Sequence, residues 1–243
     1  MRDKRRRRGS KQPDEQPDYG SLAYWDARHK GRDDQAAKFE WFASFEDIRP
    51  FVATHLKRFR TGVVVDLGCG LSRLIVDVAA AWPALRCIGV DFSNEAVRVM
   101  RASPNLPDNV SFAQTDASQS LGFASACVLV LDKSLMDTML HADDGETLVA
   151  SMLRRVALQL CDGGAWMCMT QLDPRKADDD AFLRSVVLAG FAEACPEAHW
   201  ALTAHVSDTT LLVLRKRAMH SMLGKRRPLP ASVVALKVAV YDA

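Results

Sequence analysis

The sequence lacks the cysteine and histidine pairs that hold zinc. Its six cysteines show no Cys-x-x-Cys pair, and its six histidines have no spacing typical of metal ligands. We therefore expect no metal and reduced thiols, as in an intracellular protein. The cysteines are Cys69, Cys87, Cys127, Cys161, Cys168 and Cys195.

Long apolar runs are also missing. No run reaches the roughly 18 residues that a membrane span needs, and residues 1–18 lack the hydrophobic centre of a secretory signal. We expect a soluble, intracellular protein with no membrane partner. The cytoplasm is the favoured compartment. The Arg5–Arg8 run keeps the nucleus and the mitochondrion as alternatives, although Asp3 and Asp14 oppose a mitochondrial transit peptide.

The chain has almost no net charge. Its 32 Lys and Arg balance 30 Asp and Glu to leave +2, which predicts no nucleic-acid partner. The ends are more basic, because Met1–Arg8 and Arg215–Arg227 carry six basic residues each. We interpret both as solvated segments. Neither indicates an oligomeric state.

The length of 243 residues, 48% of them apolar, predicts one catalytic domain with short appendages. Residues 1–18 are polar and basic and are predicted to be disordered. Residues 19–60 show helical spacing of apolar side chains, and we expect two or three short helices there, broken at Gly31 and near Pro50. Residues 61–217 form the predicted catalytic domain. Residues 218–243 are a tail or an extra edge strand, because 231–241 alternates like a strand.

Short β-branched runs alternate with longer amphipathic stretches through this domain. Strands rich in Val, Ile and Leu without polar alternation are typical of a parallel sheet covered on both faces. Two last strands, Trp200–Val206 and Thr210–Arg215, are too close for a crossover helix and predict an antiparallel hairpin. The fold class is therefore α/β, a Rossmann-like, seven-stranded and mostly parallel sheet with a C-terminal antiparallel hairpin and an N-terminal helical extension. The other predicted strands are Gly62–Leu67, Arg86–Asp91, Val110–Thr115, Ala126–Asp132 and Ala165–Gln171, and the helices are Arg73–Trp82, Asn94–Ala102, Gly145–Leu160 and Ala181–Ala189.

A glycine-rich turn follows the first strand, in Val63-Val-Val-Asp66-Leu-Gly68-Cys69-Gly70-Leu-Ser72. Glycines let the backbone bend sharply and approach a ligand, and the next helix offers unpaired N–H groups, with Ser72 as its expected N-cap. A nicotinamide fingerprint would need a third glycine where Arg73 stands. Asp66 would repel a pyrophosphate but suits a ligand ammonium group.

Two more acids follow the next strands. Asp91 is placed to accept hydrogen bonds from ribose hydroxyls, and Asp116 from an adenine amino group, while Phe92 packs on the adenine ring. Each Asp alone is as compatible with a turn or a helix cap. Three acids at successive strand ends favour a cationic sulfonium cofactor, S-adenosyl-L-methionine, over a nicotinamide dinucleotide.

Four segments carry a family resemblance: Phe39-Glu-Trp-Phe42, Asp66-Leu-Gly-Cys-Gly-Leu-Ser72, Gly89-Val-Asp-Phe-Ser93 and Leu131-Asp-Lys-Ser-Leu-Met-Asp137. From about Tyr24 to Arg215 the chain resembles the methyltransferase-like protein-lysine methyltransferases, the group acting on elongation factor 1-alpha and citrate synthase. The resemblance implies a class I S-adenosylmethionine-dependent methyltransferase. The predicted cofactor-binding residues are Trp25, Arg28, Asp66, Gly68, Cys69, Gly70, Ser72, Asp91, Phe92, Ser93, Asp116, Ala117 and Asp132.

The sequence departs from this family after the fourth strand. The family has Asp-Lys-Gly-Thr, one residue and Asp, whereas this chain keeps Asp132, Lys133 and Asp137 but has Ser134 and Leu135. The segment Tyr24-Trp-Asp-Ala-Arg28 resembles the family's amino-terminal segment and implies a lid over the cofactor. Ordinary helix packing is the alternative.

Methyl transfer to a lysine needs an uncharged amine aimed at the methyl group, so the site must remove a proton. Asp132 and Asp137 are the predicted catalytic acids that orient the amine. Lys133 is predicted to pair with one of them and to fix the turn. A non-catalytic Asp132–Lys133 ion pair is the alternative.

The leading hypothesis is a methyltransferase acting on a protein lysine. Two alternatives remain. A small-molecule N- or O-methyltransferase would close its pocket with aromatic residues from the first sixty positions. A cofactor-binding partner subunit would transfer nothing itself.

Overall fold

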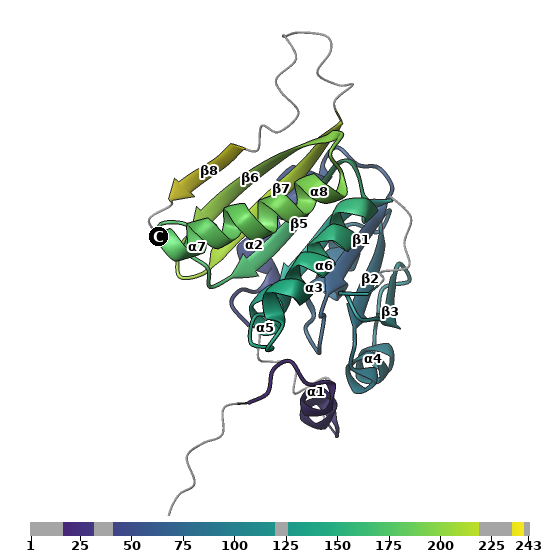
Figure 1. Ribbon diagram of the computed structural model, residues 1–243. Coiled ribbons are helices and arrows are strands. Elements are labelled where there is room, and N and C mark those ends of the chain that lie inside the picture. The colour runs from purple at the N-terminus through teal and green to yellow at the C-terminus, as the bar shows by residue number, and fades with distance from the viewer. Residues whose placement is uncertain (1–16, 32–40, 120–125, 219–234, 241–243) are drawn as a thin grey trace, which may run out of the picture.

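The computed structural model describes residues 17–31, 41–119, 126–218 and 235–240. They form one eight-stranded sheet in the order β3-β2-β1-β4-β5-β7-β6-β8, with helices on both faces (Figure 1). The helical elements are α1 (Leu22–His29), α2 (Phe45–Leu56), α3 (Leu74–Ala81), α4 (Asn94–Arg101), α5 (Leu135–Met139), α6 (Gly145–Gln159), α7 (Ala177–Phe182), the π-helix η2 (Leu183–Leu188) and α8 (Ala189–Ala194). The strands are β1 (Val63–Leu67), β2 (Arg86–Asp91), β3 (Val110–Gln114), β4 (Cys127–Lys133), β5 (Leu160–Thr170), β6 (Ala198–Val206), β7 (Thr210–Ala218) and β8 (Ala235–Val240).

The predicted fold class is confirmed. Strands β1 to β5 pair in parallel, with Val65 opposite Ile88 on one side and Val130 on the other. The hairpin of β6 and β7 is antiparallel, and β7 inserts beside β5 with Trp166 opposite Leu214. β8 adds an eighth strand, parallel to β6. The predicted edge strand at the C-terminus is therefore present, over Ala235–Val240.

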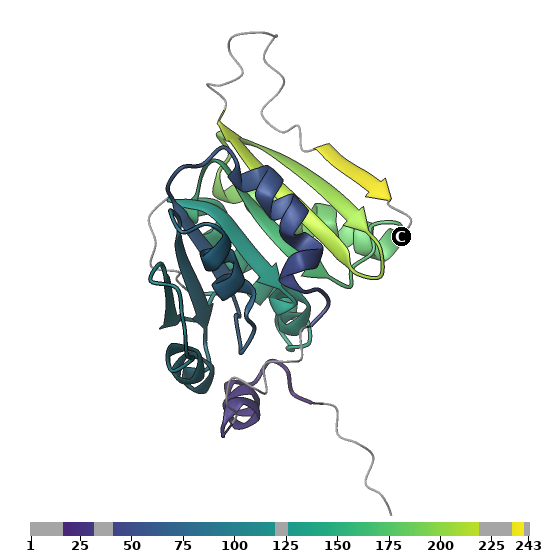
Figure 2. The same cartoon turned by 180° about the vertical axis from the view of Figure 1, so that it is seen from behind.

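Helices cover both faces of the sheet, as the apolar strands require. Helices α6 and α8 lie on the face seen in Figure 1, and α2 lies on the opposite face in Figure 2. Every residue of β4 is buried, from Cys127 to Lys133. Because β4 lies between β1 and β5, its carboxyl end is fixed in the middle of the sheet.

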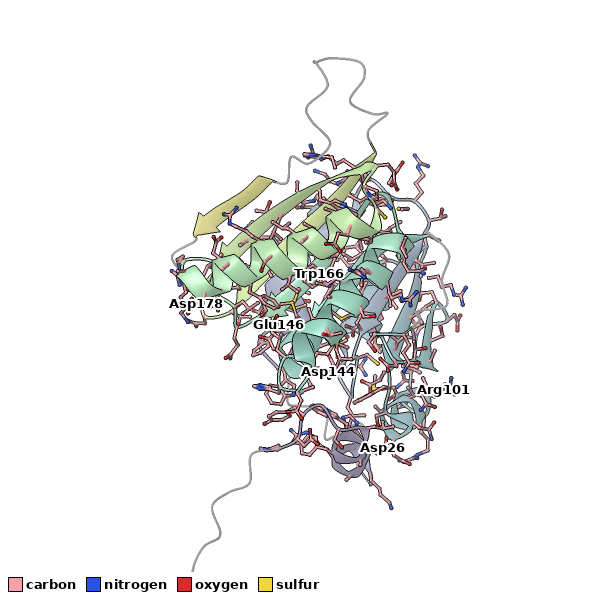
Figure 3. All side chains as sticks on the ribbon, viewed as in Figure 1. Asp26, Arg101, Asp144, Glu146, Trp166 and Asp178 are labelled. Carbon is pink, nitrogen blue, oxygen red and sulfur yellow. The ribbon has the colours of Figure 1, made fainter. Side chains whose placement is uncertain are left out.

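Three aromatic side chains join the antiparallel half of the sheet to α8. The Trp166 and Phe191 ring centroids are 5.7 Å apart, and those of Phe191 and Trp200 are 4.8 Å apart. All three side chains are fully buried, and Trp166 lies at the centre of the molecule in Figure 3. Aromatic contacts of this kind add about 0.5–1.5 kcal/mol each beyond their buried area.

Several predicted boundaries are wrong. Pro50 lies inside α2 and does not break it. The helix continues through Pro50 because this residue is exposed and near the start of the helix, so that only the Glu46 carbonyl loses its hydrogen-bond partner. The start of the helix is also capped, since the Ser44 N–H donates to the Asp47 carboxylate at 2.8 Å. β5 begins at Leu160, five residues before the prediction. The helical run Ala177–Ala194 is longer than predicted and contains the π-helix.

Some predictions fall outside the described residues. The tail was predicted over residues 1–18, of which 1–16 are not described, and Phe39 and Glu40 of the resemblance are not described either. No helix in the described part of the chain is long and apolar enough to cross a membrane.

Replacing Pro50 with Ala restores an N–H donor to α2 and removes the ring from the preceding turn. We expect the free energy of unfolding to rise by about 1 kcal/mol or more. Urea unfolding followed by circular dichroism measures this. Pro83→Ala, in the exposed turn after α3, is the matched control and should give no gain. A P50A variant no more stable than the wild type would contradict this account.

Candidate functional site

A pocket of about 740 Å³ opens at the carboxyl ends of β1, β2 and β4. Helix α1, whose Trp25 and Arg28 line the pocket, lies below the lower end of the sheet in both views (Figures 1 and 2). The volume is in the range of pockets for small molecules and cofactors, roughly 300–1,000 Å³. The predicted cofactor residues that line the pocket are Trp25, Arg28, Gly68, Cys69, Gly70, Ser72, Asp91, Phe92, Asp116 and Ala117.

The glycine-rich turn forms one wall of this pocket. Gly68 and Gly70 have φ angles of 61° and 49°, in the left-handed region that favours glycine. A side chain at Gly70 would enter open space, with His29 Nε2 the nearest atom at 3.9 Å. The turn thus leaves a backbone-lined cradle at the start of α3. Ser72 does not occupy the N-cap, which is Arg73, although its hydroxyl accepts from Leu74 N–H at 3.1 Å.

Asp91 joins this turn to the end of β2. Its Oδ2 accepts from Gly70 N–H and its Oδ1 from Ser93 N–H, each at 2.8 Å. Burial raises the pKa of Asp91 to about 6, although both hydrogen bonds oppose that shift. Asp91 therefore places a carboxylate in the pocket wall where a ribose is expected.

Asp116 lines the pocket but also holds its own turn. Its Oδ1 accepts from Ser118 N–H at 2.9 Å and from the Ser118 hydroxyl at 2.7 Å. Its Oδ2 accepts from Gln119 Nε2 at 3.0 Å. These contacts are those expected of an aspartate that forms a turn, which was the alternative to binding adenine. The contact between Asp116 and an adenine amino group therefore stays a prediction.

Three predicted cofactor residues lie outside the pocket wall: Asp66, Ser93 and Asp132. Asp66 is buried on β1 directly below the turn. Ser93 instead connects α1 to α4, because its hydroxyl donates to Asp26 Oδ1 at 2.6 Å and accepts from Ala96 N–H at 3.2 Å. His29 Nδ1 lies 3.3 Å from the same hydroxyl.

Helix α1 is therefore fixed across the pocket. On one side Asp26, labelled in Figure 3, holds it to α4. On the other side Tyr19 accepts at its carbonyl from Trp25 Nε1 at 2.8 Å, and its ring lies 5.4 Å from that of His141 beyond α5. The role of α1 as a lid over the cofactor stays a prediction. The prediction missed other lining residues, among them Tyr19, His29, Trp41, Leu135, Thr138 and Met139.

The predicted catalytic acids hold the turn after β4. Asp132 Oδ1 accepts from Leu135 N–H at 2.9 Å and from Met136 N–H at 3.3 Å. Burial, together with the nearby Asp137, raises the pKa of Asp132 to about 7. Asp137 Oδ1 accepts from the Thr170 hydroxyl at 2.9 Å and from Gln171 N–H at 3.0 Å, and burial raises its pKa too.

Of the Asp132–Asp137 segment, Lys133, Ser134 and Leu135 line the pocket, while Asp132 and Asp137 lie behind them. Ser134 has φ 74°, the left-handed conformation for which the resembled family uses glycine. The backbone turn is thus kept despite the substitution. Lys133 is only 9% exposed, and its predicted pairing with an acid stays a prediction.

The pocket fits S-adenosyl-L-methionine. Its volume is adequate, the cradle at Gly70 is open, and Asp91 places a carboxylate in the pocket wall. No cluster of three metal-ligating side chains occurs among the described residues.

Comparison with known proteins supports this assignment. Residues 64–159 match the family model described as a methyltransferase domain. The chain is 33% identical over 159 residues to the eEF1A lysine and N-terminal methyltransferase of Danio rerio, covering 63% of this chain and 21% of that protein. Its counterpart in Xenopus laevis is 26% identical over 161 residues, covering 65% and 22%. The chain thus spans about a fifth of the length of these relatives.

Among solved structures, a TehB-like SAM-dependent methyltransferase from Corynebacterium glutamicum superposes with a TM-score of 0.51 at 15% identity, covering 81% of this chain and 97% of that one. This likeness shows the fold alone.

The fold, the pocket and the match to the family model together define the class of protein. The chain carries an S-adenosylmethionine-dependent methyltransferase domain, and S-adenosyl-L-methionine is its cofactor. Two proteins to which the chain is similar in sequence are named as eEF1A lysine and N-terminal methyltransferases.

Cofactor affinity should fall at acidic pH. Asp91 has a pKa of about 6, and protonation below that pH removes the charge that accepts from ribose hydroxyls. We expect the Kd for S-adenosylhomocysteine, measured by calorimetry, to be about tenfold higher at pH 5 than at pH 7. Asp91→Asn should bind weakly and without this pH dependence. An affinity of the wild type that is flat across this range would contradict the role of Asp91.

Ser134→Gly should stabilise the protein by about 0.5–1 kcal/mol, because glycine adopts a positive φ without the steric cost that serine bears. Thermal unfolding measures the change. Ser103→Gly, at a residue without positive φ, should destabilise and serves as the control. Equal losses in both variants would show that Ser134 bears no strain.

Proposed function

We propose that this chain transfers a methyl group to a lysine side chain of a protein. The observation that carries the proposal is the 33% identity to a protein named as an eEF1A lysine and N-terminal methyltransferase. Both amine types in that name share one chemistry, a primary or terminal amine that must lose a proton. The carry-over of a protein substrate to this chain is part of the proposal.

The shape of the pocket supports an aliphatic amine as the acceptor. Beyond the glycine-rich turn, α1, α5 and the residues after α5 contribute apolar side chains, Leu22, Leu135, Met139 and Ala142, beside the polar Arg28 and Thr138. Such walls suit the methylene stem of a lysine and disfavour the charged form of its amine. When bound, S-adenosyl-L-methionine supplies the methyl group on a cationic sulfonium.

Asp132 and Asp137 both lie behind the pocket wall, and the buried Oδ2 of each accepts no hydrogen bond from any described residue. We assign the proton-accepting role to Asp137, whose Oδ1 is held by Thr170 and Gln171 at the end of β5. Burial raises the pKa of Asp137, which makes its carboxylate a stronger base than an exposed aspartate. Asp132 anchors the turn through two backbone N–H groups and keeps Asp137 beside the end of β5.

A labelling experiment tests the substrate class. The purified chain is incubated with methyl-labelled S-adenosylmethionine and a cell extract, and the products are separated into proteins and small molecules. We expect label in protein, recovered after hydrolysis as methyl-lysine. Label confined to small molecules would replace this proposal with the small-molecule methyltransferase, and label at protein N-termini would change the acceptor amine.

Replacing Asp137 with Asn should lower kcat about a hundredfold while leaving the Kd for S-adenosylhomocysteine within twofold of the wild type. Asp132→Asn should lower kcat less. Asp179→Asn is the matched control, because Asp179 also accepts from a backbone N–H, that of Asp173 at 2.8 Å, but lies on α7 and not at the turn after β4. Full activity in D132N and D137N would leave both acids a purely structural role.

A further inference from the structure

A second cavity of about 360 Å³ lies between the start of α2 and the tip of the β6–β7 hairpin. Apolar side chains form much of its wall, among them Phe42, Ile48, Phe51 and Leu211. None of the predicted site residues lies in it. The hairpin tip is at the carboxyl edge of β5, which is the edge that carries the cofactor pocket.

The second cavity adjoins the cofactor pocket at two points. Trp41 lines the cofactor pocket, and the next residue, Phe42, lines the second cavity. Ser134, in the cofactor pocket, donates its N–H at 3.0 Å to the carbonyl of Met169, which lines the second cavity. A substrate polypeptide that inserts a side chain into the cofactor pocket would therefore pass close to the second cavity.

Residues 41–43 separate the two cavities, and this short ridge has an unusual backbone. Phe42 has φ 62°, a conformation uncommon for a bulky residue, and Ala43 N–H donates across it to the Trp41 carbonyl at 2.7 Å. The Thr209 hydroxyl lies 3.5 Å from the Phe42 carbonyl and links the ridge to the hairpin. Outliers of this kind gather at binding sites because surrounding contacts must hold them in place.

The polar groups of the second cavity favour a cation. Asp47 stays ionised because hydrogen bonds from Ser44 lower its pKa, and Asp208 is exposed at the hairpin tip without a hydrogen bond or ion pair to any described residue. His205 is kept neutral, since burial lowers its pKa, and its ring lies 4.6 Å from Phe51. Two carboxylates above apolar walls match an arginine or lysine, whose long stem packs on apolar surface.

We propose that this second cavity binds a basic side chain that flanks the target lysine in the protein substrate. The inference rests on the proposed function, because it assumes that the acceptor belongs to a polypeptide. Asp208 is the specificity-determining residue, since it supplies a charge that no other described group neutralises. Asp47 holds the start of α2 and adds a second negative charge.

Binding of fluorescein-labelled peptides to the full chain tests this, by anisotropy at saturating S-adenosylhomocysteine. Two eleven-residue peptides each contain a central lysine. In the first peptide two arginines flank this lysine on each side, and in the second peptide two glutamates do so. We expect the wild type to prefer the arginine peptide. Asp208→Asn should weaken that peptide about fivefold, and Asp208→Arg should reverse the preference.

Asp108→Asn is the matched control, because Asp108 is equally exposed but lies before β3, at the opposite edge of the sheet. It should change neither affinity. Equal binding of the two peptides by the wild type, or a preference that survives in D208R, would overturn the inference. Methyl transfer to the same peptides is measured separately. Arginine-selective binding without any lysine methylation would uphold the cavity and refute the proposed function.

Discussion

The carboxylate of Asp91 is the contact on which the rest of the site depends. It receives the N–H groups of Gly70 and Ser93, and so fixes the glycine-rich turn and the start of α4 to the end of one strand. Ser93 in turn holds Asp26 of α1. A single buried acid thus sets the positions of the floor of the pocket and of the helix beneath it. Burial raises the pKa of Asp91 to about 6, while the backbone donors aimed at it lower the pKa and so favour the charged form of this anchor.

The same device recurs at the end of β4, where Asp132 receives two backbone N–H groups and Asp137 joins α5 to β5. In both places a carboxylate is removed from water and its pKa rises. Such groups reduce stability compared with apolar residues, so their presence at the ends of β2 and β4, the two neighbours of β1, follows from the needs of the pocket. The parallel sheet supplies the rigid frame that holds them in place.

Features of the fold and the site that depend on residues close together in the sequence were predictable, and contacts between residues far apart in the sequence were not. The bounds of strands β1 to β4 were predicted within one residue, because uninterrupted Val, Ile and Leu define a buried parallel strand by themselves. The glycine-rich turn and Asp91 followed from local order along the chain. The contact of Asp26 with Ser93 joins residues 67 positions apart, and the inclusion of Tyr19 and Trp41 in the pocket depends on how α1 docks. Local patterns carry no signal for these contacts. The predicted break at Pro50 was wrong because the effect of a proline depends on its position in the helix, which the local pattern did not give.

The eighth strand has a consequence for self-association. Without β8, the nine-residue strand β6 would end the sheet and present a long row of unpaired backbone groups to solvent, a template for edge-to-edge aggregation. β8 pairs with Ala201–Val206 and moves that edge outward. The new edge strand has six residues where β6 has nine, and a shorter edge offers fewer unpaired backbone groups to another chain. The C-terminal strand therefore shortens the sheet edge at which a second chain could pair.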